Sequence, residues 1–254
     1  MTRTSRSVAA ACAALLALAA PQFARAQNFS AAQKSDIERV VHDYLMAHPE
    51  VIQDAMTELE KRQTAAEAEK HKIAVKEQAE KLFSSPNQVT LGNPNGNVTF
   101  VEFFDYNCGY CKRAMDDMLT LMKDDPKLKV VLKEFPVLGP GSLEAARVAV
   151  AVRMQNPKKY LDFHTKLLGG RGPADEEHAL AVAKDIGMNM AQLQKDMKSP
   201  EVKATLDEDF KLAETLGLNG TPSYVIGSDV VVGAIGLPAL QTKINGARCG
   251  KATC

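Results

Sequence analysis

The chain has 254 residues, with 31 basic and 31 acidic side chains, and 45% of its residues are hydrophobic. This length suffices for one large core or two small ones. The balance of charge argues against nucleic acid as a partner and against strong adsorption to an anionic membrane.

Residues 1–26 have the features of a secretory signal peptide. Arg3 and Arg6 give a basic start, residues 8–20 are apolar, and Ala24-Arg25-Ala26 is a small-x-small cleavage site. A retained membrane anchor is the less favoured alternative, because a spanning helix needs ~20 apolar residues. We expect an exported protein that begins at Gln27. The removed segment carries three arginines and no acid, which leaves a net charge of −3.

The region that follows, residues 30–83, has a helical pattern with few apolar positions. Ser30 or Ser35 is suited to cap a first helix, since a serine hydroxyl accepts from the free backbone N–H groups there. His48-Pro49 should end this helix, because a residue before proline avoids the helical conformation. Two separate helices are therefore expected in this region.

The second helix is predicted to run from Glu50 to about Phe83, with no proline or glycine inside. Its apolar residues form a narrow, heptad-like stripe: Ile52, Met56, Leu59, Ala66 and Ile73. Such a stripe packs either on the rest of the protein or on further copies as a weak coiled coil. A solvated linker helix is the alternative.

After two turn-rich segments, 84–87 and 92–97, the pattern becomes that of an α/β domain. Strands are predicted at Val98–Phe104 and Leu128–Phe135, the second alternating, with a helix at Cys111–Met122 between them. Further elements are a helical block Ser142–Leu216 with breaks at 156–157, 169–173, 187 and 199–200, a hairpin of Ser223–Ile226 and Val230–Ala234, and a helix Pro238–Asn245. The order is β-α-β, a helical insertion, and β-β-α.

Cys108-Gly109-Tyr110-Cys111 lies between the first strand of this domain and its helix. The start of a helix favours an anion, and the thiolate is the form of cysteine that attacks disulfides. Cys108, nearer the helix start and more exposed, is the expected attacking sulfur. Cys111, one turn further in, would resolve a mixed disulfide. Gly109 and Tyr110 would tune the pKa of the thiols.

Two other interpretations of these cysteines remain open. Cys12 leaves with the signal segment, and Cys108 and Cys111 could join Cys249 and Cys254 in a zinc site. A closed structural disulfide between Cys108 and Cys111 is the second possibility. The terminal pair is expected to form a small disulfide loop, with a second redox pair as its alternative. We predict no metal and no cofactor, since Met115, Met118 and Met122 have the helical spacing of a core face and the five histidines show no paired ligand spacing.

Two further positions are candidates for the site. Glu102 interrupts an apolar strand six residues before Cys108, where burial would raise its pKa and let it relay protons to or from Cys111. An edge-strand glutamate that faces solvent is the alternative. Thr221-Pro222 precedes a strand; X-Pro is the bond that can be cis, and a cis bond would free Thr221 backbone groups to pair with an extended substrate.

Together these residues resemble the DsbA-type branch of the thioredoxin superfamily. The resemblance rests on Phe100-Val101-Glu102-Phe103-Phe104-Asp105-Tyr106-Asn107-Cys108-Gly109-Tyr110-Cys111 and on Gly220-Thr221-Pro222-Ser223-Tyr224, and it covers residues 86–246. It implies a thioredoxin fold with a helical insertion, a catalytic dithiol at Cys108 and Cys111, and a cis Pro222 that faces them. Glu102 matches the family's buried acid.

Residues 30–83 resemble the helical N-terminal region of the ScsC (suppressor of copper sensitivity C) proteins, where it drives oligomerisation. The Gly-Tyr pair between the cysteines and the threonine before the cis proline are similar to those of DsbC isomerases. The expected division is a signal peptide at 1–26, a helical oligomerisation stalk at 27–85 and a DsbA-like thioredoxin domain at 86–254. The location that this resemblance implies is the periplasm.

The expected function is that of a thiol–disulfide oxidoreductase acting on protein disulfides, and we favour an isomerase or reductase. A monomeric dithiol oxidase is the alternative within this chemistry, and a copper- or zinc-binding protein is the alternative outside it. The expected partners are cysteine-containing protein substrates, a membrane redox partner that resets the dithiol, and further copies of the chain through residues 30–83.

Overall fold

A computed structural model describes residues 29–254, so the signal peptide expected at 1–26 lies outside the described residues. In the described part, no helix is both long and apolar enough to cross a membrane. The chain divides into two compact units, which meet between Glu60 and Lys61. This boundary falls inside helix α2 (Glu50–Glu77).

The first unit is built from α1 (Ala31–Ala47) and the beginning of α2. Ser30 caps α1 in a full capping box: its hydroxyl accepts from the Gln33 backbone, and the Gln33 side chain accepts from the Ser30 backbone. No residue of α1 is buried. Its apolar residues and those of the first turns of α2 face solvent: Ile37, Val40, Val41, Tyr44, Ile52, Met56 and Leu59.

The predicted single helix from Glu50 to Phe83 is wrong at its end. Helix α2 stops at Glu77, and a short helix α3 (Ala79–Phe83) follows a turn at Gln78. The physical reason is packing, because Val75 and Leu82 are both buried in one apolar cluster on the sheet. The apolar stripe predicted for this helix is therefore not buried: Ile52 and Ile73 stay half exposed. Only the segment from Val75 to Leu82 enters a hydrophobic core.

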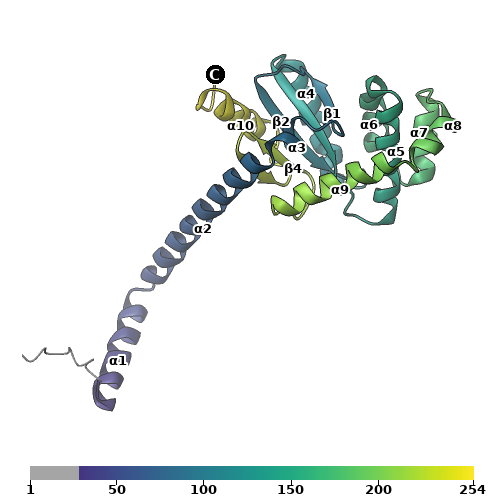
Figure 1. The fold of residues 1–254 in the computed structure, drawn as a ribbon. Coiled ribbons are helices and arrows are strands. Elements are labelled where there is room, and N and C mark those ends of the chain that lie inside the picture. The colour runs from purple at the N-terminus through teal and green to yellow at the C-terminus, as the bar shows by residue number, and fades with distance from the viewer. Residues whose placement is uncertain (1–28) are drawn as a thin grey trace, which may run out of the picture. The chain divides into compact units, whose positions relative to one another are not determined.

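The second unit contains a five-stranded sheet with the order β1-β3-β2-β4-β5. Figure 1 labels three of these strands, β1, β2 and β4. Its strands are β1 (Val89–Gly92), β2 (Val98–Phe104), β3 (Leu128–Glu134), β4 (Ser223–Ile226) and β5 (Asp229–Val232). β2 and β3 pair in parallel, and the other three pairs are antiparallel. The first strand of the hairpin lies where it was predicted, whereas the second, expected at Val230–Ala234, begins one residue earlier and ends at Val232.

Sequence analysis missed β1 altogether. This strand has only four residues, two of them apolar, and turn residues flank it on both sides. It exists because it can pair with the edge of β3, with Val89 opposite Leu132. Such pairing is a tertiary contact, which a local pattern cannot reveal.

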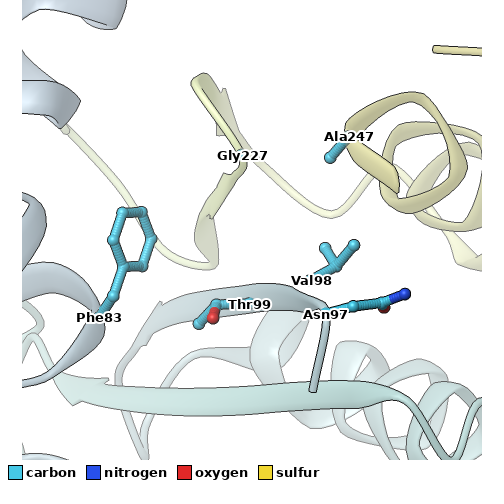
Figure 2. Close-up of a pocket in the computed structure, with 6 residues that line it drawn as sticks. All are labelled: Phe83, Asn97, Val98, Thr99, Gly227 and Ala247. Atoms are coloured by element: carbon cyan, nitrogen blue, oxygen red, sulfur yellow. The ribbon is translucent and has the colours of Figure 1, made fainter. Parts of the chain in front are cut away.

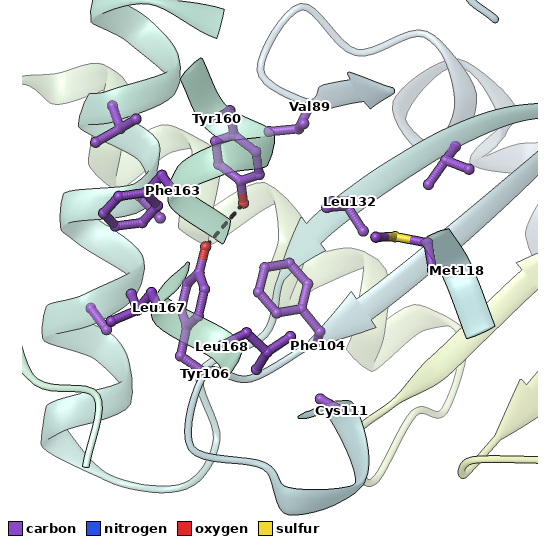
Figure 3. Packing of buried hydrophobic residues seen from close by; sticks show 14 of the residues in the cluster. Val89, Phe104, Tyr106, Cys111, Met118, Leu132, Tyr160, Phe163, Leu167 and Leu168 are labelled. Carbon is purple, nitrogen blue, oxygen red and sulfur yellow. Dashed lines mark hydrogen bonds between the residues drawn. The ribbon is translucent and has the colours of Figure 1, made fainter. Parts of the chain in front are cut away.

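Strands β2 and β3 are covered by helices on both faces of the sheet. On one face, Phe100 and Phe104 of β2 pack with Cys111 and Met118 of α4 (Gly109–Asp124), and Figure 3 shows part of this cluster. On the other face, Val101 and Phe103 pack with α3 and with α9 (Pro200–Thr215). β3 was expected to alternate between buried and exposed positions, and this is wrong: it is buried almost throughout, since both of its faces carry helices.

The expected helical insertion is present between β3 and β4, and its four predicted breaks are confirmed. It consists of α5 (Pro140–Gln155), a 3₁₀ turn (Pro157–Lys159), α6 (Tyr160–Gly169), α7 (Glu176–Asp185), α8 (Met190–Asp196) and α9. Figure 1 shows α5 to α8 gathered beside the sheet. The last helix, α10 (Leu237–Cys249), is longer than predicted and reaches the cysteine tail.

Candidate active site

Cys108 occupies the N-cap position of α4, directly after the end of β2. Its sulfur accepts a hydrogen bond from the backbone N–H of Cys111 at 3.3 Å. As a thiol it donates to the backbone carbonyl of Thr221 at 3.2 Å. The helix start therefore offers an N–H donor to a negative sulfur at this position, the arrangement that favours a thiolate.

Cys111 lies one turn into α4 and is completely buried, whereas Cys108 keeps 5% of its surface exposed. Burial raises the pKa of the Cys111 thiol, and the neighbouring Glu102 raises it further, while a hydrogen bond from the Asp105 backbone lowers it. Cys108, the expected attacking sulfur, is thus the more accessible of the two. The second sulfur stays protonated until a base takes its proton.

Glu102 lies on β2 between β3 and β4, so it is not the edge-strand glutamate of the alternative interpretation. Its side chain is buried on the face of the sheet that carries α4. Burial, followed by the charge of Asp117 on α4, raises the pKa of this carboxyl to about 8. A carboxyl with this pKa can take up and release protons near neutral pH.

The Thr221–Pro222 peptide bond is cis, as the family resemblance implied. The turn places the Thr221 carbonyl against the sulfur of Cys108 and leads directly into β4. The two segments of the motif, more than a hundred residues apart in the sequence, are therefore in contact. Backbone groups at this position are suited to pair with an extended peptide beside the thiol.

Sequence reasoning did not assign a role to Asp105 or Asn107, which hold the loop before Cys108. The Asp105 carboxylate accepts from the backbone N–H groups of Asn107, Val137 and Leu138 and from the Ser142 hydroxyl, all within 2.9 Å. The Asn107 side chain bonds the Ser142 hydroxyl and both backbone groups of Ala174. The Asp-Tyr-Asn run before Cys108 was the available signal, since such residues commonly bond nearby backbone.

The loop that Asp105 anchors presents apolar side chains to solvent. Val137 and Leu138 are about half exposed, and so is Tyr110 between the two cysteines. The Arg113 guanidinium lies over the Tyr110 ring, 4.4 Å from its centroid. Exposed apolar side chains of this kind are typical of surfaces that contact another polypeptide.

The terminal cysteines are bonded to each other. The Cys249–Cys254 disulfide joins the last residue of α10 to the tail, and both residues are exposed. Their sulfurs are therefore not available to share a zinc site with Cys108 and Cys111. Among residues 29–254, no group of three or more His, Cys, Asp or Glu side chains is placed to hold a metal ion.

One pocket lies at the opposite end of β2 from the thiols (Figure 2). Its lining consists of Phe83, Asn97, Val98, Thr99, Gly227 and Ala247. These six residues include no acid, base or nucleophile that the chemistry of the dithiol could use. The pocket therefore has no part in the candidate active site.

A thioredoxin-like sheet with a cysteine pair at a helix start and a cis proline beside it defines the class of thiol–disulfide oxidoreductases. Residues 99–245 match the DSBA-like thioredoxin domain, and residues 33–66 match the copper resistance protein ScsC N-terminal domain. Within that class the chain therefore belongs to the DsbA family. The thioredoxin fold and the resemblance drawn from the motifs are thereby confirmed.

Solved structures agree with this assignment. A thioredoxin-like oxidoreductase from Silicibacter pomeroyi DSS-3 is 46% identical, covers 66% of this chain and 96% of its own, and superposes with a TM-score of 0.64. The thiol-disulfide exchange protein alpha-DsbA2 from Wolbachia pipientis is 31% identical, with 71% and 97% coverage and a TM-score of 0.67. Salmonella enterica Typhimurium BcfH is 26% identical, covers 85% and 96%, and gives a TM-score of 0.73.

Curated relatives fall into two groups. The probable disulfide bond formation protein D of Bacillus cereus is 26% identical over 165 residues, which are 60% of this chain and 76% of that protein. The Na(+)/H(+) antiporter NhaA 1 of Mycobacterium sp. (strain KMS) is 28% identical over 142 residues. The chain spans 22% of the length of that antiporter.

Proposed function

We propose that this protein is an exported, periplasmic oxidoreductase that isomerises or reduces wrong disulfides in other proteins. In this proposal residues 1–26 are a signal peptide, 27–85 an oligomerisation region and 86–254 the catalytic domain. The observation that carries it is the sulfur of Cys108, which sits at a helix start against the Thr221 carbonyl of a cis-proline turn. That position offers both thiolate stabilisation and backbone pairing for a client.

The reaction begins when the Cys108 thiolate attacks one sulfur of a client disulfide. A mixed disulfide between Cys108 and the client forms, the client's own S–S bond breaks, and the second client sulfur leaves as a thiolate that takes a proton from water. In isomerisation, another client thiol attacks the mixed disulfide and releases Cys108. In reduction, Cys111 attacks instead, after its proton has passed to Glu102.

An isomerase needs Cys108 in the reduced state, and oligomerisation supports that requirement. Several dithiols around a shared space can hold one misfolded client and hinder re-oxidation by an oxidase partner. The apolar residues of α1 and early α2 are exposed, as Tyr44, Ile52 and Met56 illustrate, and the match to an ScsC N-terminal domain covers this segment. Burial of such a stripe between copies would be favourable.

A dithiol oxidase is the second candidate. The name of the Bacillus cereus relative, a disulfide bond formation protein, favours it. An oxidase would rest with Cys108 and Cys111 bonded and would depend on a membrane partner to restore that bond. Thiol trapping in intact cells distinguishes the two, since an isomerase keeps this pair mostly reduced.

Reactivation of scrambled ribonuclease tests the chemistry itself. The full chain should restore ribonuclease activity, and Cys108→Ser should reduce the rate to the uncatalysed background, because a hydroxyl does not replace a thiolate as attacking group. Undiminished activity of Cys108→Ser would refute the proposed function.

Light scattering tests the oligomeric part. Ile52→Glu with Met56→Glu places two charges on the exposed apolar stripe and should reduce the mass of the assembly. Gln53→Glu with Thr57→Glu is the matched control, since it adds the same charges beside the stripe. Equal masses for both variants and the parent chain would remove the argument for self-association through this helix.

A further inference from the structure

One buried polar group beside the thiols has no role in the mechanism above. The Tyr224 hydroxyl is completely enclosed and makes no hydrogen bond in the structure. An unpaired buried hydroxyl is costly, and such groups are uncommon in native proteins. Its ring packs on Phe100 with the two centroids 5.2 Å apart, so the side chain is firmly placed.

The strand register places Tyr224 beside the acid of the site. Tyr224 of β4 is directly opposite Glu102 of β2 in their antiparallel pairing. Directly opposite residues project from the same face of a sheet with their Cβ atoms about 5 Å apart. Tyr224, Phe100, Phe104 and Cys111 belong to one core cluster, so this shared face is the one that carries α4.

The charges that reach Tyr224 belong to the same small group. Burial raises the pKa of the Tyr224 hydroxyl, and Glu102, Cys111, Asp117 and Cys108 raise it further, in that order. The hydroxyl therefore keeps its proton and remains a hydrogen-bond donor. Around Glu102, α4 and its cap contribute Cys108, Cys111 and Asp117, β4 contributes Tyr224, and β3 places Leu132 opposite. Tyr224 is the hydroxyl donor of this group.

We propose that Tyr224 is a positioning residue that donates its hydroxyl hydrogen bond to the Glu102 carboxylate when Glu102 ionises. The inference rests on the proposed function. In the resolving step the Cys111 thiol passes its proton to the ionised Glu102. The Cys111 thiolate then attacks the sulfur of Cys108, the new Cys108–Cys111 bond forms, and the client sulfur leaves as a thiolate. Tyr224 is unpaired while Glu102 is protonated and paired while Glu102 awaits the proton.

The test uses the reduced full chain with Cys12, Cys249 and Cys254 replaced by serine, so that two thiols report. An aromatic disulfide with a coloured thiol product, 5,5′-dithiobis(2-nitrobenzoate), gives one product thiol when Cys108 attacks and a second when Cys111 resolves the mixed disulfide. Both phases are followed from pH 6 to 10. Tyr224→Phe keeps the ring and its packing on Phe100, and Tyr160→Phe is the control, because that hydroxyl bonds Glu134.

We expect the pH midpoint of the second phase to move up by about one unit in Tyr224→Phe. At pH 7 this shift slows resolution roughly tenfold, since one pKa unit is a tenfold change in the ionised fraction. The first phase should be unchanged, and Tyr160→Phe should leave both phases as they are. In a Glu102→Gln background, Tyr224→Phe should have no further effect.

Two results would overturn the inference: an unchanged midpoint in Tyr224→Phe, or an equal slowing when Glu102 is already glutamine, which would show that Tyr224 acts on Cys111 or on packing. Failure of the proposed function looks different. In that case Cys108 would not react in the first phase, in the parent chain as in every variant.

Discussion

The two cysteine pairs of this protein lie at opposite kinds of helix end. Cys108 and Cys111 are at the start of α4, buried, and bonded to backbone groups. Cys249 and Cys254 are at and beyond the end of α10, exposed, and joined to each other. A helix start favours a negative sulfur, whereas a helix end disfavours it. The helix start thus suits Cys108 to thiol–disulfide exchange, whereas the helix end suits Cys249 and Cys254 to a lasting disulfide.

The largest expected effect separates the two pairs directly. Cys111→Ser removes the resolving thiol, so mixed disulfides between Cys108 and client proteins should accumulate at least tenfold above the parent chain. Non-reducing electrophoresis of acid-quenched samples measures them. Cys249→Ser with Cys254→Ser is the control and should trap no clients. Accumulation in that control would mean that the terminal pair exchanges with clients as well.

A second comparison sets the contacts that hold the loop before the first pair against an exposed ion pair on the helix that carries Cys249. Asp105→Ala leaves four donors around the first pair without their acceptor, and at roughly 1 kcal/mol each this should lower the free energy of unfolding by about 4 kcal/mol. Asp229→Ala breaks the exposed ion pair to Lys243 on α10 and should cost at most about 1 kcal/mol. Denaturant titration measures both, and equal losses would contradict the importance of the Asp105 contacts.

Glu102, beside the first pair, makes the stability of the folded protein depend on pH. Its pKa is about 8 in the folded protein against an ordinary 4.5, so between these values the folded state holds a proton that the unfolded state has lost. Stability is therefore lost as the pH rises from 4.5 through 8. Glu102→Gln should raise the free energy of unfolding by about 4 kcal/mol at pH 8 and change it little at pH 4.

Denaturant titration at the two pH values measures this difference. Asp117→Asn is the matched control, since it removes the neighbouring charge but leaves the burial of Glu102, which is the larger cause of its raised pKa. The gain should be smaller there. A Glu102→Gln variant that is equally stable to the parent chain at both values would show that the carboxyl is not held protonated.

The smallest effect is expected at the terminal disulfide. Cys249→Ser with Cys254→Ser opens a short loop whose residues are all exposed. The free energy of unfolding, measured by thermal unfolding, should therefore fall by about 1 kcal/mol or less. The rate of ribonuclease reactivation should not change. A marked loss of activity would instead assign the second pair a part in redox exchange.

Local sequence features predicted much of the fold and the candidate site. Cys108 at a strand-to-helix junction and the proline-marked breaks of the insertion are local signals, since caps and proline act within a few residues. The burial of Glu102 also followed from its apolar neighbours on β2. These features could be predicted because interactions between residues close in the sequence determine them.

Features that depend on distant contacts were not predictable in this way. β1 exists through pairing with β3, and Lys133 is buried at the end of β3 because Asp209 and Glu208 of α9 neutralise it. The four bonds to Asp105 and the isolation of the Tyr224 hydroxyl are likewise products of the tertiary fold. Unlike Glu102, these buried polar residues gave no sequence pattern that could be detected.

The burial of Leu82 limits how far the chain can be shortened from its N-terminus. It is completely buried against the sheet, the Phe83 carbonyl accepts from Lys129, and the Ser85 hydroxyl donates to Glu208. A protease that trimmed the protein past this segment would strip one wall from the apolar core beside Phe103, even though every cysteine of the dithiol remained. Cleavage nearer Glu60, where the two compact units meet, would spare that wall.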